Sequence, residues 1–445
     1  MKSAGFDSRF ELVALNDTLQ LHAGGGNVSS QKYNPFKPND IVHAGMFAGR
    51  IDELRIIERC LFQAKMGSQQ HFMIQGERGI GKSSLLLYVN HVAEGRISPL
   101  KGDDLRFVSI PVDLGGCQSQ SDIVRKVGRG LRQAIGQRNT LKESAKGVWD
   151  WITNWEVLGV KYNKTDNEID LEEIAEQFVT NLADFCETTA HQVDGLLFLM
   201  DEADRPTVES GLGAYLKLIS ERLTWKGCHK VVFGLAGLPS LMEKLRDSHE
   251  SSPRLFHTMN LLPLTPEERK RVIQVGLQEA NVKNAVQTEI TGEAINFLAE
   301  LSEGYPHFLQ QFSYCAFERD TDDVINEGDV GDGAFEDGGA LSQLGDKFFN
   351  EMYHARISSA EYRRVLDAMA EHGDRWIPRK KIIAESGVTE ANVTNALQAL
   401  KSKGVILQDD KLRGSYRLPT NSFAAWINAV KAARAKSDAQ NESPF

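Results

Sequence analysis

The chain has 445 residues, 41% of them apolar, and a formal net charge of −10. This length exceeds one compact domain, and no run approaches eighteen consecutive apolar residues, so we expect two or three domains and no membrane-spanning helix. No secretory signal is visible and the five cysteines lie far apart, which favours a cytoplasmic protein without a disulfide framework or a zinc site.

The charge is distributed unevenly along the chain. Residues 356–436 hold 15 lysines and arginines against 8 acids, whereas residues 1–355 hold 36 against 51. The acidity of the larger part argues against a nucleic-acid surface over the whole chain. The basic C-terminal part is expected to meet a partner that the rest does not.

The N-terminal half predicts a sheet domain. Residues 1–34 are polar and predict a flexible arm. Asp52 and Glu53 then open an apolar-periodic helix. Five short apolar runs follow, separated by helical patterns, which predicts a parallel sheet covered on both faces within residues 35–264. The runs are HFMIQG, RFVSIPVDL, LLFLMDE, KVVFGLAGL and HTMNLLPL.

The C-terminal half predicts helices and a second small domain. Helical patterns at 266–280, 291–302 and 306–319 indicate a helical lid over 265–319. Residues 320–345 begin with DTDDVINEGDVGDGAFEDGG, whose acids and glycines predict a solvated linker. Calcium binding is the alternative there, although the spacing lacks the EF-hand order.

The last part has the order of a winged helix-turn-helix. Three helices and then two strands around a turn are expected within residues 346–430. Residues 431–445 are expected to form a tail.

The stretch HFMIQGERGIGKSSLLLYVN, residues 71–90, carries a glycine-rich loop between a predicted strand and a predicted helix. Glycines let successive backbone N–H groups face one point, and the helix N-terminus adds partial positive charge, which suits a phosphate. The loop therefore predicts ATP binding, with Lys82 on the β- and γ-phosphates and the Ser83 hydroxyl on Mg²⁺. The residues expected around the phosphates are Gly76, Glu77, Arg78, Gly79, Ile80, Gly81, Lys82, Ser83 and Ser84.

A second acidic motif fits hydrolysis. LLFLMDEAD, residues 196–204, is an apolar strand that ends in Asp201 and Glu202. Asp201 is expected to hold Mg²⁺ together with Ser83, and Glu202 to polarise the attacking water. A buried strand that ends in acids where it reaches solvent is the alternative.

These motifs resemble the AAA+ and STAND classes of P-loop ATPases over most of residues 35–430. MFAGRIDEL, residues 46–54, resembles the Gly-Arg box that lines the adenine pocket in such proteins, which implies a role for Phe47, Gly49 and Arg50. SEGYPHFLQQFSYCAFE, residues 302–318, resembles the lid helix. The resemblance implies an α/β core of parallel strands, a helical lid and a C-terminal winged helix.

The resemblance also implies two nucleotide sensors. Pro306 and His307 begin the lid helix, where His307 would approach the γ-phosphate or simply cap the helix. Arg254 lies where related ATPases carry an arginine before the last core strand, so it is the candidate arginine finger for a neighbouring subunit in an oligomer. Arg246 is the second candidate, and a surface arginine without a role is the alternative.

Two departures from the resemblance favour a switch over a fast enzyme. Lys82 and Asp201 lie 119 residues apart, and the surplus falls in an insert at about 118–190. Its tryptophans Trp149, Trp151 and Trp155 indicate either an aromatic patch packed on the core or a partner surface. The fourth strand ends in GLAGLP, without the usual polar sensor.

The expected winged helix offers side chains that suit duplex DNA. Its third helix, residues 389–403, presents amides for base edges and lysines for phosphates, and the wing adds further cations. Asp409 and Asp410 in the wing would repel phosphates, and such domains also serve protein contacts. The candidate DNA contacts are Arg379, Lys380, Asn392, Asn395, Lys401, Lys411 and Arg413.

Two functions remain open from the sequence. In the first, the chain is a DNA-associated AAA+ ATPase. In the second, it is a STAND-like signalling switch that assembles with itself or with a protein partner that carries the effector activity. The basic C-terminal part favours the first, and the missing sensor, the long insert and the overall acidity favour the second.

Overall fold

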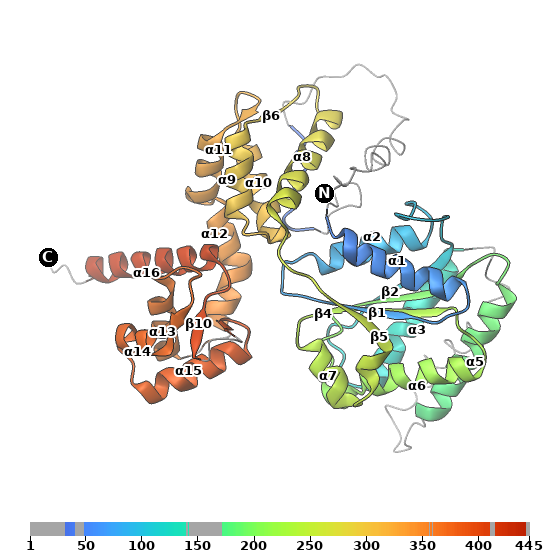
Figure 1. Ribbon diagram of the computed structural model, residues 1–445. Helices are drawn as coiled ribbons and strands as arrows, with labels where there is room; N and C mark the ends of the chain where they lie inside the picture. The colour runs from blue at the N-terminus through green and yellow to red at the C-terminus, as the bar shows by residue number, and fades with distance from the viewer. Residues whose placement is uncertain are drawn as a thin grey trace, which may run out of the picture. The chain divides into compact units, whose positions relative to one another are not determined.

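The computed structural model describes residues 32–40, 49–138, 141, 171–355, 357, 359–409 and 414–441. The chain divides into two compact units (Figure 1). The first unit includes Asp40–Leu262, and the second comprises Ser30–Asn39 and Pro263–Phe445. In the part of the chain that is described, no helix is long and apolar enough to span a membrane.

The first unit is built on a five-stranded sheet in the order β2-β3-β4-β1-β5, in which every pair of neighbours is parallel. All five expected runs form strands, which confirms the predicted sheet. β3 and β4 are buried along nearly their whole length, as a parallel sheet covered on both faces requires. The strands are β1 (His71–Gln75), β2 (Phe107–Asp113), β3 (Gly195–Asp201), β4 (Val231–Gly237) and β5 (Phe256–Asn260).

Helices cover both faces of this sheet (Figure 1). On one face lie α1 (Ile51–Lys65) and α2 (Lys82–Ala93). The other face carries α3 (Gln120–Gly136), α5 (Leu171–Thr188), α6 (Leu212–Trp225) and α7 (Leu241–Ser248). Thus α3 and α5 lie within the expected insert, whereas Trp149, Trp151 and Trp155 fall outside the described residues.

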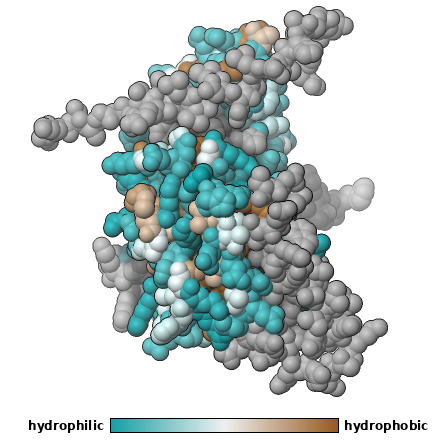
Figure 2. Space-filling view, turned by 90° about the vertical axis from the view of Figure 1, so that its right-hand side faces the viewer, coloured by the Kyte–Doolittle hydropathy of each residue, from teal (hydrophilic) through white to brown (hydrophobic). Residues whose placement is uncertain are grey.

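The core of the first unit is aromatic at its centre. The rings of Phe198 and Phe233 lie 5.4 Å apart on adjacent strands, and Phe178 of α5 meets Phe198 edge-on. On β4, a Cβ at Gly234 would lie 2.3 Å from the Phe72 ring, so this strand position admits no side chain. In contrast to this apolar core, the face of the molecule in Figure 2 is mainly hydrophilic, with scattered hydrophobic residues.

The second unit contains the predicted lid helices and the predicted winged helix. The lid helices are α8 (Pro266–Lys283), α9 (Gly292–Leu301) and α10 (Pro306–Arg319). The winged helix contains α13 (Ala360–Ala370), α14 (Arg379–Ser386) and α15 (Glu390–Ser402), together with a small antiparallel sheet in the order β8-β10-β9. Its first strand precedes α14, and the other two strands follow α15. Its strands are β8 (Ile377–Pro378), β9 (Leu407–Gln408) and β10 (Ser415–Arg417).

Residues 320–345 are not the solvated linker that their composition predicts. They form β7 (Val324–Ile325), which pairs with β6 (Glu289–Ile290), and then α11 (Glu327–Phe335) and α12 (Ala340–Leu344). Asn326 and Asp329 form a capping box that starts α11. Most of the acids are exposed, although Asp320 is buried. The buried apolar side chains are those of Ile325, Val330, Ala334, Ala340 and Leu344.

The N-terminal boundary also differs from the expectation, because residues 32–39 belong to the second unit. Phe36 is buried, and its ring fills the space beside Gly276 of α8. The Tyr33 hydroxyl donates to Glu279 at 2.7 Å, and the Lys37 N–H donates to Gln310 at 2.8 Å. This segment is therefore a strap over the lid helices, held by contacts across more than 240 residues of sequence, which no local pattern reveals.

The C-terminal boundary is later than expected, because α16 runs from Asn421 to Asn441. Trp426 on this helix stacks against Phe423 and lies 5.6 Å from the Tyr353 ring. Gly345 sits directly against the Trp426 indole, where a Cβ would have no room. Phe308 of α10 meets Phe349, which in turn lies 5.9 Å from the Trp426 ring, so an aromatic cluster joins the lid to the winged helix within one compact unit.

A pair of glycines in α11 tests whether the acidic segment is a packed helix. Gly333→Ala is expected to destabilise the protein by about 1–3 kcal/mol, because its Cβ would lie 2.8 Å from the α10 backbone at Ala316. Gly331→Ala is the matched control, since nothing lies within 4 Å of its Cβ, and it should stabilise by about 0.5–1 kcal/mol. Urea unfolding measures both changes. Equal effects of the two substitutions would contradict the packed helix.

Candidate functional site

The loop at residues 76–81 joins β1 to α2 and curls back on itself. Gly79 and Gly81 have φ angles of 79° and 96°, which favour glycine because a Cβ is strained there. The Ile80 side chain folds over Gly76, where a Cβ would lie 2.8 Å from the Ile80 methyl group. Glu77, Arg78 and Ser84 lie along the same loop and the first turn of α2. The sequence pattern is therefore realised as a tight turn that ends at a helix N-terminus.

Lys82 is held over this loop from the first position of α2. Its Nζ donates to the carbonyl oxygens of Gly76 at 2.9 Å and of Glu77 at 2.8 Å. Burial lowers the pKa of Lys82, while the carboxylates of Asp201, Asp204 and Glu77 act in the opposite direction. A partly buried ammonium group beside turned backbone amides is suited to an anion.

Ser83 and Asp201 meet although 118 residues separate them. The Ser83 hydroxyl donates to Asp201 Oδ2 at 2.5 Å. Because β4 lies between β1 and β3, this hydrogen bond spans the tip of β4. The structure thus brings together the two residues that the sequence predicts as Mg²⁺ ligands. A hydroxyl and a carboxylate are ligands that this ion prefers, so the pair fits Mg²⁺.

Glu202 has an unusual backbone beside this pair. Its φ of 51° lies in the left-handed region, which costs a non-glycine residue roughly 1–2 kcal/mol. Its N–H donates to Asp201 Oδ1 at 2.8 Å, which fixes the Asp201 carboxylate from the second side. The Glu202 carboxylate lies against Gly115, beyond the end of β2, with the Arg205 Nε 3.8 Å away.

Arg50 supports the loop from the start of α1. It is 7% exposed, and its guanidinium donates to the Ile80 carbonyl at 3.2 Å and lies 3.6 Å from Glu53. Gly49 and Arg50 both have positive φ, at 83° and 62°. Phe47, which the sequence also places at the adenine, lies outside the described residues.

Arg254 is not near this loop within the first unit. It lies in the 3-10 turn η6 (Ser252–Leu255), directly before β5. Phe256 at the start of β5 pairs with His71 at the start of β1, whereas the loop follows the far end of β1. Arg254 and Arg246 are both exposed, and the role of an arginine finger stays a prediction for each of them.

Pro306 and His307 belong to the second unit, so their approach to a nucleotide stays a prediction. Pro306 is the first residue of α10, where proline is well suited to a helix start. The His307 ring lies 6.1 Å from the Phe348 ring.

The described candidate DNA residues lie on α14 and α15. Lys380, Asn395 and Lys401 are exposed, whereas the Asn392 amide donates to Glu361 at 2.8 Å. Arg379 pairs with Glu390 at 2.9 Å. Lys411 and Arg413 lie outside the described residues.

Sequence reasoning missed Glu303, which joins the lid to the winged helix. Its carboxylate accepts from the N–H groups of Asn421 and Ser422 at 2.7 and 2.8 Å, and from the Ser422 hydroxyl at 2.9 Å. It therefore caps the N-terminus of α16 from the loop between α9 and α10. Burial raises the pKa of Glu303, and the bonds from α16 oppose that shift.

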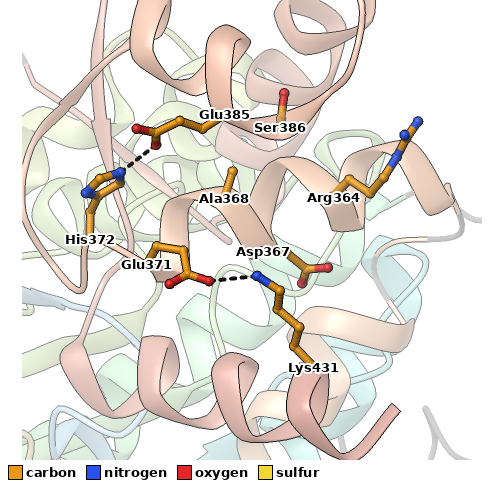
Figure 3. Close-up of a pocket in the computed structure, with 8 residues that line it drawn as sticks. All are labelled: Arg364, Asp367, Ala368, Glu371, His372, Glu385, Ser386 and Lys431. Atoms are coloured by element: carbon orange, nitrogen blue, oxygen red, sulfur yellow. Dashed lines mark hydrogen bonds and ion pairs between the residues drawn. The ribbon is translucent and has the colours of Figure 1, made fainter. Parts of the chain in front are cut away.

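A hollow of about 440 Å³ lies in the winged helix between α13, α14 and α16 (Figure 3). Charged side chains line it, and four of them form two pairs with one another. His372 bonds Glu385 at 2.6 Å, and Lys431 bonds Glu371 at 2.6 Å. Because these four side chains already pair with each other, they are less available to a ligand. The hollow is therefore a weaker candidate site than the loop at 76–81.

Comparisons with known proteins agree with this arrangement. No family model matches the chain. A Walker-type ATPase of Pyrococcus abyssi is 18% identical, with 86% of this chain and 96% of that chain covered and a TM-score of 0.54. The ORC2 protein of Aeropyrum pernix, solved in ADPNP-ADP complexes, is 14% identical, with 91% and 99% covered and a TM-score of 0.56.

One protein is similar to part of this chain in sequence. An uncharacterized HTH-type transcriptional regulator of Methanocaldococcus jannaschii is 26% identical over 282 residues, which are 62% of this chain. The match spans 64% of that relative's length. The likeness to the solved structures shows that this chain has the fold of the Walker-type ATPase and of ORC2, with a P-loop core, a helical lid and a C-terminal winged helix.

Proposed function

We propose that the chain binds ATP with Mg²⁺ and hydrolyses it slowly, as a switch whose nucleotide state acts on the winged helix. The hydrogen bond from Ser83 to Asp201 carries this proposal, because it places a hydroxyl and a carboxylate directly beside the anion-binding loop. The names of two similar proteins, a Walker-type ATPase and ORC2 with ADPNP and ADP, support the choice of ligand.

Each residue has a defined task in this proposal. The amides of the loop bind phosphate oxygens, and Lys82 exchanges the carbonyls of Gly76 and Glu77 for the β- and γ-phosphates. Ser83 and Asp201 hold Mg²⁺, which supplies charge neutralisation at the phosphates when bound. Glu202 accepts a proton from water after turning away from Gly115. The tip of β4 offers no polar side chain, which favours slow turnover.

The nucleotide site is tested by removing its charges. Lys82→Ala should weaken ADP and ATP binding by about 10–100-fold, because a charge-assisted contact contributes roughly 1.5–3 kcal/mol. Asp201→Asn should retain binding without Mg²⁺ but lose the gain in affinity that Mg²⁺ gives. Calorimetry measures both. Lys101→Ala, an exposed lysine of the same unit, is the control. A wild-type protein that takes up neither nucleotide would refute the proposal.

Glu303 provides a route from the lid to the winged helix. The residue lies four positions before His307, which the sequence predicts to approach the nucleotide. A shift of this loop would move the carboxylate that caps α16, so nucleotide binding would alter the N-terminal turn of that helix. The capping bonds are few and strong, which suits a contact that is made and broken.

The cap can be tested by hydrogen exchange. Glu303→Ala should leave the Asn421 and Ser422 amides without their acceptor, cost about 1–2 kcal/mol of stability and accelerate their exchange. ATP should change the exchange of these amides in the wild-type protein but not in this variant. Glu300→Ala, an exposed acid at the end of the neighbouring α9, is the control. A nucleotide response that survives in Glu303→Ala would exclude this route.

For the partner of the winged helix, we propose duplex DNA. The name of the M. jannaschii relative, an HTH-type transcriptional regulator, supports this choice. Exposed Lys380 and Lys401 can meet phosphates, and exposed Asn395 on α15 can meet a base edge. The Asn392 amide would have to leave Glu361 before it could do so.

Salt dependence distinguishes this proposal from a purely protein-binding switch. Replacing Lys380 and Lys401 together by alanine should lower the slope of log affinity against log salt by about two. Replacing Lys101 and Lys226, two exposed lysines of the first unit, is the matched control and should leave the slope unchanged. Fluorescence anisotropy with a DNA duplex measures the slopes. Weak binding that does not vary with salt would favour the switch that acts through protein partners.

That second function has support of its own. The net charge of the chain is −10. Several cations of the winged helix already have partners: Arg379 pairs with Glu390, and Lys401 donates to the side-chain oxygen of Gln408. Protein contacts would not require these pairs to open.

A further inference from the structure

The tip of β4 lies between the phosphate loop and the acidic pair but has no polar side chain of its own. The strand order places β4 between β1 and β3, and the strand ends at Gly237, followed by Leu238 and Pro239. A polar group at this place must therefore come from another element of the unit.

Asp204 supplies such a group. It is 7% exposed, and its Oδ1 accepts from the Leu238 N–H at 2.9 Å. The same Oδ1 lies 2.9 Å from the point where a Cβ on Gly237 would be. The carboxylate thus occupies the volume in which a side chain at Gly237 would begin.

The tip of β4 is connected to the phosphate loop as well as to Asp204. The Gly76 N–H donates to the Gly237 carbonyl at 3.2 Å, and the Gln75 amide donates to the Pro239 carbonyl at 3.2 Å. On the other side, the Ala203 N–H donates to the Ala236 carbonyl at 2.9 Å. Lys244 from α7 donates to the Asp204 carbonyl at 2.5 Å and so holds its backbone in place.

We propose that Asp204 is a positioning residue of the nucleotide site, whose buried carboxylate replaces the side chain that Gly237 lacks and holds the tip of β4 against the first residue of the phosphate loop. This inference rests on the proposed ATPase function and adds a residue to it. Asp204 acts through Leu238 and Gly237, so no contact with the nucleotide is required.

Two variants test the role of the carboxylate oxygen that accepts from Leu238. Asp204→Asn keeps an oxygen acceptor at this place, and Asp204→Ala removes it. We expect kcat to fall by about 10–100-fold in Asp204→Ala and by clearly less in Asp204→Asn, with the affinity for ADP at pH 7 retained in both. Asp247→Asn, an exposed aspartate on α7, is the control.

The outcomes are distinct. Wild-type kcat in Asp204→Ala, or an equal loss of kcat in Asp204→Ala and Asp204→Asn, overturns the inference. If Asp204→Ala does not fold, Asp204→Leu, which has a similar shape but no acceptor, takes its place with the same expected loss of kcat. A wild-type protein that binds no nucleotide refutes the proposed function, whereas a wild-type protein that hydrolyses ATP alongside unaffected variants refutes only the role of Asp204.

Discussion

The hydrogen bond between Ser83 and Asp201 constrains the whole first unit, because it must reach across the strand that separates β1 from β3. Ser83 lies in the first turn of α2, so this helix has to start close to the carboxyl ends of the strands, where Asp201 lies. That start depends on the left-handed turn at Gly81. The strand between β1 and β3, which is β4, has little room for side chains at two positions. Gly234 lies against the Phe72 ring, and Gly237 lies against Asp204. The two glycines of β4 are therefore explained by the space at these positions and not by strand propensity, which disfavours glycine.

The second unit uses a different kind of connection. The aromatic cluster around Trp426 buries apolar surface and favours one fixed arrangement of α16 on the preceding helical turns. The Glu303 cap adds a small number of directional bonds to the N-terminal turn of the same helix. Packing of this kind changes little with a small shift of a loop, whereas capping bonds are lost within an ångström or so. In the proposed switch, the cap is accordingly the part of this junction that the nucleotide would influence.

The sequence predicts the features whose signals are local. The strands have continuous apolar runs, and the phosphate loop has its glycines, so both could be placed. The packed helix at residues 327–335 was hidden because its acids and glycines resemble a solvated segment, although the capping box at Asn326 and Asp329 was a readable sign. The strap at residues 32–39 and the Glu303 cap depend on partners far away in sequence. Their side chains, such as that of Phe36, carry no periodicity that could reveal them.

Backbone strain links these separate observations. Among the described residues, four that are not glycine have positive φ, and they are Arg50, Glu202, Glu303 and Asp323. Each such residue costs roughly 1–2 kcal/mol, so a compensating contact is expected. Arg50 holds the Ile80 carbonyl, the Glu202 N–H fixes Asp201, Glu303 caps α16, and Asp323 pairs with Lys32 of the strap. Three of the four thus position the phosphate loop, its acidic pair or the winged helix, so the strain is concentrated along the route that the proposed switch would use.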